Sequence, residues 1–104
     1  MATAADIFLI IKKKIVDILP EASVSLFGSR ATDTANEESD WDILIITKNT
    51  PDKKIKRVVQ EALFPLSLNL ASFINIIIAS ESDWNNDPSY YSLQQSIYAQ
   101  SKVA

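Results

Sequence analysis

The sequence predicts an α/β (α+β) domain: a small mixed β-sheet backed by helices on one face. Three observations support this class. Isoleucines recur at helical spacing near the N-terminus, short β-like segments alternate with amphipathic stretches, and a β-branched run follows the second amphipathic stretch. At 104 residues the chain has the usual length of one domain, so we expect residues 1–104 to form a single domain.

The N-terminal elements follow from apolar spacing and from the residues that end each segment. A helix is expected from about Ala4 to Leu19, and Pro20 stops it. Ser23 to Phe27 alternates as a short strand that ends at Gly28. A helical turn should begin at Ser29, and the polar, acidic segment from Thr32 to Ser39 should form a loop. The apolar face of the first helix is formed by Ile7, Ile11, Ile15 and Ile18.

The second half of the chain predicts two strands and two helices. Trp41–Thr47 is a strand that the run Ile43–Ile46 predicts to be buried on both faces. Thr50 and Pro51 are the expected N-cap and first residue of a helix that continues to Pro65. Leu68–Ala79 is the most β-like segment, and we expect its Phe73 in the core. A last helix should start at Asp87-Pro88 and carry Tyr91, Ile97 and Tyr98.

Composition excludes several kinds of chemistry. The net charge of -3 provides no overall basic field for nucleic acid. The absence of cysteine excludes disulfides and thiol catalysis, and the absence of histidine excludes histidine triads and most zinc sites. Any reaction must therefore use carboxylates, hydroxyls, amines or metal ions. The apolar run Ile7–Ile11 is too short to span a bilayer, and lysines follow rather than precede it, so we expect a cytoplasmic protein without membrane contact.

Asp40 and Asp42 are the first candidate functional residues. Side chains alternate along a strand, so these two carboxylates share one face while Trp41 and Ile43 share the other. Carboxylates this close repel each other unless a cation lies between them, and Mg²⁺ is commonly held by one or two carboxylates plus substrate phosphates. An Asp-x-Asp pair alone is weak evidence, but the buried strand that follows it favours a Mg²⁺ site, with Mn²⁺ as the alternative.

Gly28, Ser29 and Arg30 are the second group of candidates. Gly28 is the single glycine of the chain and lies between a strand and the expected helical turn, which indicates a positive φ or a close approach of another group. Free N–H groups at a helix start bind anions, and Ser29 Oγ or Arg30 could add contacts to phosphate. Gly-Ser before a helix is usually only a turn with an N-cap. The aspartate pair ten residues later favours a phosphate site instead.

The combined motif resembles that of a known family. Gly28-Ser29-Arg30-Ala31 followed by Ser39-Asp40-Trp41-Asp42-Ile43-Leu44-Ile45 is similar to the signature of the minimal nucleotidyltransferases of the DNA polymerase β superfamily. The resemblance covers essentially the whole chain, and Ser80–Trp84 through Tyr90-Tyr91 and Ile97 also resembles the tail of bacterial members.

The resemblance implies a fold, an activity and partners. The fold would be the polymerase β-like core, with Gly28 and Ser29 holding a nucleoside triphosphate, most simply ATP, and Asp40 and Asp42 holding Mg²⁺. The reaction would transfer a nucleoside monophosphate to a hydroxyl of a protein or nucleic acid and release pyrophosphate. Bacterial members resemble antitoxins that pair with, and in some cases adenylylate, a helical HEPN-type ribonuclease toxin.

One departure from the family pattern concerns a third carboxylate on the next strand. The segment Ser72–Ile78 has no acid there, and Asn75 is the best candidate for the equivalent position, with Ser72 second. Asparagine can offer a carbonyl to a metal but cannot act as a base. Glu81 and Asp83 lie beyond the strand. The alternative function is therefore a catalytically weakened or inactive nucleotide-binding module that regulates a partner.

Other features have simpler interpretations. The basic clusters Lys12–Lys14 and Lys53–Arg57 are expected on exposed helix faces, with RNA or partner contact as the alternative. The aromatic residues of the C-terminal segment could stack on a nucleobase, but packing against the sheet is favoured; they are Trp84, Tyr90, Tyr91 and Tyr98. A small α/β domain with a fortuitous motif remains the third reading.

Overall fold

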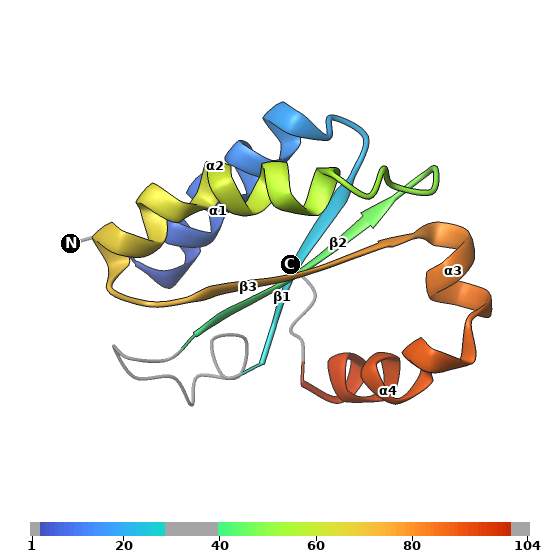
Figure 1. Ribbon diagram of the computed structural model, residues 1–104. Coiled ribbons are helices and arrows are strands. Elements are labelled where there is room, and N and C mark those ends of the chain that lie inside the picture. The colour runs from blue at the N-terminus through green and yellow to red at the C-terminus, as the bar shows by residue number, and fades with distance from the viewer. Residues whose placement is uncertain (1–2, 29–39, 101–104) are drawn as a thin grey trace.

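The computed structural model describes residues 3–28 and 40–100 and confirms the predicted fold class. Among the described elements, a helix precedes the first two strands, a second helix separates them from the third, and the chain after the third strand is helical (Figure 1). The elements are α1 (Ala4–Ile18), β1 (Ser23–Phe27), β2 (Trp41–Thr47), α2 (Ile55–Leu70), β3 (Ile74–Ser80), α3 (Glu81–Asn86), the 3₁₀ helix η2 (Pro88–Tyr90) and α4 (Tyr91–Gln100). Among the helices described, none is long and apolar enough to cross a bilayer.

The three strands form one mixed sheet in the order β1-β2-β3. β1 pairs antiparallel with β2, and β3 pairs parallel with β2 after the crossover through α2. The register places Phe27 of β1 and Asn75 of β3 on either side of Asp42. This register decides which side chains can meet at the candidate site, because it aligns the start of β2 with the start of β3.

The main core lies between the sheet and the two long helices. Side chains at Trp41, Ile43 and Ile45 point to this side of β2, as strand alternation predicts. Figure 1 shows α1 and α2 covering one side of the sheet. The buried members of this core are Ile11, Ile15, Trp41, Ile43, Ile45, Val59, Leu63 and Ile76.

The opposite face of the sheet carries a second, smaller cluster beneath the C-terminal helices. Leu44 and Ala79 pack there with Trp84 of α3, whose ring lies 5.6 Å from that of Tyr90. The packing interpretation of Trp84 and Tyr90 is therefore confirmed, whereas Tyr91 is exposed. The expected helical backing of one face describes α1 and α2, and the C-terminal helices add a partial cover on the other.

The predicted boundaries of α2 were wrong at both ends. Thr50 and Pro51 precede the helix, which begins at Ile55 after a turn in which Asp52 Oδ1 accepts a hydrogen bond from the Lys54 backbone N–H. The helix also continues through Pro65 to Leu70. Proline removes one helical hydrogen bond, but Leu66 and Leu70 beyond it pack on the main core. Tertiary packing of this face outweighs the local cost of the proline.

The third strand is shorter than the sequence indicates. Leu68 to Leu70 belong to α2, and β3 begins only at Ile74. Phe73, expected in the core, is 75% exposed because it precedes the strand and lies beyond the cover of α2. The short helix α3 was not predicted; Ser80 caps it by accepting a hydrogen bond from the Asp83 backbone N–H.

Candidate functional site

Asp40 and Asp42 lie at the start of β2, where its buried segment begins. Asp40 is exposed immediately before the strand, and Asp42 is half-buried within it. The strand is held in place by its own burial, since Trp41 and Ile43 are almost completely covered by the main core. The Trp41 backbone N–H also donates to the Phe73 carbonyl oxygen at 2.8 Å. The backbone that carries the two aspartates is therefore held by the core, while Asp40 is exposed to solvent and Asp42 is partly exposed.

Asn75 joins the two carboxylates. Its Nδ2 donates to Asp40 Oδ2 at 3.3 Å and to Asp42 Oδ1 at 3.2 Å. An amide oxygen in this position would face two carboxylates, so the donor orientation is the favourable one. The predicted orientation of Asn75 toward the aspartates is confirmed. Both carboxylates converge on one nitrogen, which is the arrangement expected where a cation could bind between them.

Gly28 ends β1 beside the same carboxylate pair. Its φ is +75°, and a Cβ built at this position would lie 2.3 Å from Asp42 Oδ2. Both sequence interpretations of this glycine therefore hold, because the backbone is left-handed and another group approaches it closely. The approaching group is Asp42 itself. Gly28 thus lets the end of β1 come against the carboxylate that β2 presents.

The other candidates are placed less directly. Ser29, Arg30 and the expected loop 32–39 lie outside the described residues. The Ser72 hydroxyl donates to the Leu70 carbonyl oxygen at 3.4 Å. Glu81 and Asp83 belong to α3, which follows the far end of β3 from Asn75. Within the part of the chain that the structure describes, His, Cys, Asp and Glu nowhere gather in threes that could hold a metal ion.

Charge at the site comes from the aspartates. Among the described side chains, the salt bridge found is Arg57 Nε to Glu61 Oε1 at 3.0 Å on the surface of α2. Among the described residues, neither Asp40 nor Asp42 forms a salt bridge with a basic side chain. Asn75 Nδ2 is the hydrogen-bond donor that the two carboxylates share. A site of this kind attracts a cation, or a cation bound to phosphates.

Sequence reasoning missed a groove that opens next to Asp40. It has a volume of about 780 Å³ and lies between the C-terminal half of α2 and the start of β3. The spacing of apolar residues along the sequence does not distinguish exposed positions from core positions. The sequence therefore contains only a weak signal for this groove. We call it the α2–β3 groove; its lining residues are Asp40, Gln60, Leu63, Phe64, Ser67, Leu68, Ala71, Ser72, Phe73 and Ile74.

Comparisons with known proteins identify the family of the chain. The family model described as a nucleotidyltransferase domain matches residues 10–87, a span that includes Gly28, Asp40, Asp42 and Asn75. A protein of Methanocaldococcus jannaschii whose name assigns it as a protein adenylyltransferase is 38% identical over 58 residues, which are 50% of this chain. The match spans 40% of the length of that relative.

A solved structure shares the fold. A chain of the complex between a tri-AMPylated HEPN toxin and MNT antitoxin from Shewanella oneidensis superposes with a TM-score of 0.57. The match covers 96% of this chain and 70% of that one, at 20% sequence identity. At this identity the likeness concerns the fold.

Proposed function

The chain belongs to the nucleotidyltransferase domain family, and we propose that it is a Mg²⁺-dependent adenylyltransferase domain. It would transfer AMP from ATP to a hydroxyl of a protein or nucleic acid, in the cytoplasm, as the antitoxin partner of a HEPN-type toxin. The observation that carries this proposal is the convergence of Gly28, Asp40 and Asp42 at the start of β2. The Methanocaldococcus relative, which is named as a protein adenylyltransferase, supports AMP as the transferred group.

The donor set fits Mg²⁺ or Mn²⁺. Asp40 and Asp42 offer carboxylate oxygens that converge on a single point, now held by the Asn75 nitrogen, and both reach solvent. Oxygen ligands from one or two carboxylates, completed by phosphates and water, are the usual environment of Mg²⁺ at nucleotide sites. When bound, the metal supplies positive charge that offsets the charge of the reacting phosphates.

The protein residues then have separate tasks. Asp40 and Asp42 would hold the metal-nucleotide. Gly28, whose missing Cβ leaves room for the Asp42 carboxylate, would let phosphate approach the backbone beside it, with Ser29 and Arg30 as further phosphate contacts. The acceptor oxygen attacks the α-phosphorus, the bond from that phosphorus to the bridging oxygen breaks, and pyrophosphate leaves. The hydroxyl proton passes to solvent, because an asparagine at position 75 cannot accept it.

Labelled transfer tests this function directly. The chain is incubated with ATP labelled at the α-phosphate, with Mg²⁺ or Mn²⁺, and with a HEPN-type protein from the same genome. We expect label on that protein, and none when Asp40→Asn replaces the wild type. Asp40→Asn alters one carboxylate at the surface, so its circular dichroism spectrum, compared with that of the wild type, serves as the folding control. Failure of transfer with every metal and acceptor would rule out the enzyme.

A second function is favoured by Asn75 itself. If the missing base prevents transfer, the chain would be a nucleotide-binding module that neutralises its partner by contact. In this case the two proteins would co-purify without any change in the mass of the partner. Asp40→Ala would then leave growth protection against the toxin unchanged, whereas the enzyme predicts that protection is lost.

A further inference from the structure

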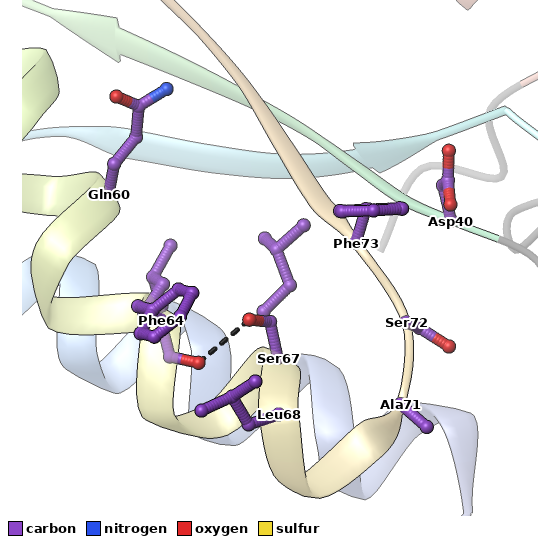
Figure 2. A pocket seen from close by; sticks show the side chains of 10 residues that line it. Asp40, Gln60, Phe64, Ser67, Leu68, Ala71, Ser72 and Phe73 are labelled. Atoms are coloured by element: carbon purple, nitrogen blue, oxygen red, sulfur yellow. Dashed lines mark hydrogen bonds between the residues drawn. The ribbon is translucent and has the colours of Figure 1, made fainter.

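The α2–β3 groove exposes large apolar side chains beside the candidate site. Phe64 and Leu68 of α2 are 59% and 65% exposed, and Phe73 is 75% exposed. Figure 2 shows Phe64 and Leu68 on the α2 side of the groove and Phe73 and Asp40 at its other end. Apolar residues gathered from two elements, next to a reactive centre, mark an interaction surface more strongly than scattered exposed residues do.

The order of the strands gives this groove a place in the reaction. Gly28 directly follows β1, Asp40 and Asp42 lie at the start of β2, and Phe73 and Asn75 lie at the start of β3. Attacking and leaving oxygens stand roughly in line on opposite sides of the phosphorus. The α2–β3 groove reaches the site at Asp40. If the pyrophosphate lies on the Gly28 side, a hydroxyl that enters along this groove arrives from the opposite, β3 side.

The lining of the groove also indicates the chemistry of its occupant. Among the described residues that line it, Asp40 is the single charged one, and none of them is lysine or arginine. Nucleic acid is held chiefly by basic side chains that contact phosphate. Apolar side chains of a protein segment, by contrast, would gain burial against Phe64, Leu68 and Phe73.

We propose that the α2–β3 groove binds an apolar segment of the acceptor protein and brings a hydroxyl of that segment to Asp40. This inference rests on the proposed function, which left protein and nucleic-acid acceptors open, and it assigns the acceptor to protein. Binding in the groove fixes the direction of attack, so it should contribute to acceptor affinity without contributing to ATP binding.

Polar substitutions in the groove test this surface. The double variant Phe64→Gln, Leu68→Gln keeps good helix formers on exposed positions of α2, and Phe73→Thr changes the opposite wall. With a HEPN-type protein as the probe, we expect each variant to raise the Kd for this protein, and the KM of transfer to it, by about tenfold or more. The thermal shift given by Mg²⁺-ATP should stay that of the wild type.

Leu9→Gln is the matched control, because Leu9 is 60% exposed on α1 and does not line the groove. It should leave the Kd and KM unchanged. Equal Kd values for wild type and both groove variants would overturn the proposal, as would a wild type that binds no HEPN-type protein. Label transferred to a pool of RNA oligonucleotides, and retained by the groove variants, would overturn the assignment to protein. If wild type binds the protein through the groove but transfers nothing, the proposed enzyme fails while the docking surface stands.

Discussion

At the scale of single residues, Asn75 has the largest influence on the chemistry of the site. It stands opposite Asp42 in the register of β2 and β3 and donates to both carboxylates. Its neutral amide donates two hydrogen bonds that offset part of the mutual repulsion of the aspartates, which remain like charges side by side. The same position, if acidic, would complete a triad of carboxylates. The side chain at position 75 thus decides whether two or three carboxylates face one another at this site.

Replacing this asparagine by aspartate tests that conclusion. Asn75→Asp adds a third negative charge about 3 Å from the other two and removes both donated hydrogen bonds. We expect a lower Tm without metal, a larger rise of Tm with Mg²⁺ than in wild type, and faster transfer if transfer occurs. Asn75→Ala is the control, since it removes the hydrogen bonds without adding charge and should not tighten Mg²⁺ binding. An unchanged response of Asn75→Asp to Mg²⁺ would contradict the assignment.

Gly28 carries a separate prediction. Gly28→Val places a branched side chain at φ +75°, with its Cβ 2.3 Å from Asp42 Oδ2 unless something moves. We expect loss of nucleotide binding and a decrease of about 1–3 kcal/mol in the free energy of unfolding. Ser29→Ala should be milder, costing about 0.5–1.5 kcal/mol of binding through one lost hydrogen bond. ATP titration by calorimetry measures the nucleotide affinity, and urea unfolding measures the stability. A Gly28→Val variant that binds ATP with wild-type affinity would contradict the assignment of a phosphate site to Gly28.

At the scale of elements, α2 keeps its helical form across an unfavourable residue. Pro65 is exposed in the interior of the helix, where it cannot donate a hydrogen bond to the Glu61 carbonyl oxygen and its ring crowds that carbonyl. We expect Pro65→Ala to raise the free energy of unfolding by about 1–3 kcal/mol. Urea denaturation provides the measurement, with Pro51→Ala outside the helix as the control that should change little. A loss of stability in Pro65→Ala would show that the proline is required for the packing of Leu66 and Leu70.

The capping box at the start of α1 gives a prediction for pH. Hydrogen bonds from the Thr3 backbone N–H, and then from its side chain, hold the pKa of Asp6 below its ordinary value of 3.8. A lowered native pKa means that the charged form stabilises the fold, fully above the ordinary pKa, and that this contribution is lost as the pH falls through the native pKa. The stability difference between wild type and Asp6→Asn should therefore shrink as the pH falls below the ordinary pKa of 3.8. A difference that grows on acidification would contradict it.

Elements and site were predictable to different degrees. The run Ile43–Ile46 identified β2. Asn75 was placed with the aspartates by alternation together with two further assumptions, that the two strands are neighbours and that the resemblance implies a third acidic position there. The continuation of α2 beyond Pro65 was not predictable, because it depends on Leu66 and Leu70 reaching a core that local sequence does not reveal. Phe73 was misplaced for the same reason: apolar character predicts burial, and whether a neighbour covers the side chain is a tertiary property.

At the scale of the whole molecule, the sheet separates two regions. The main core between the sheet and the long helices supplies the rigid support, while the start of β2 and β3 presents the carboxylates and the α2–β3 groove at one end. The smaller cluster around Leu44 and Trp84 covers the opposite face farther along the strands. Side chains can therefore change at the site with little effect on the main core, so ligand binding and fold stability can be measured separately.

The most direct test of the account is the Tm of the whole chain with ATP, with and without Mg²⁺, in wild type and in Asp42→Asn. A ligand that binds the native state raises Tm, and the rise grows with the logarithm of the ligand concentration relative to its Kd. The account predicts a Mg²⁺-dependent rise with ATP in wild type and none in Asp42→Asn, whose ligand-free Tm should equal or exceed that of wild type because repulsion is relieved. The same rise in both proteins, or an Asp42→Asn variant that melts well below wild type without ligand, would contradict the assignment of this carboxylate to metal and nucleotide.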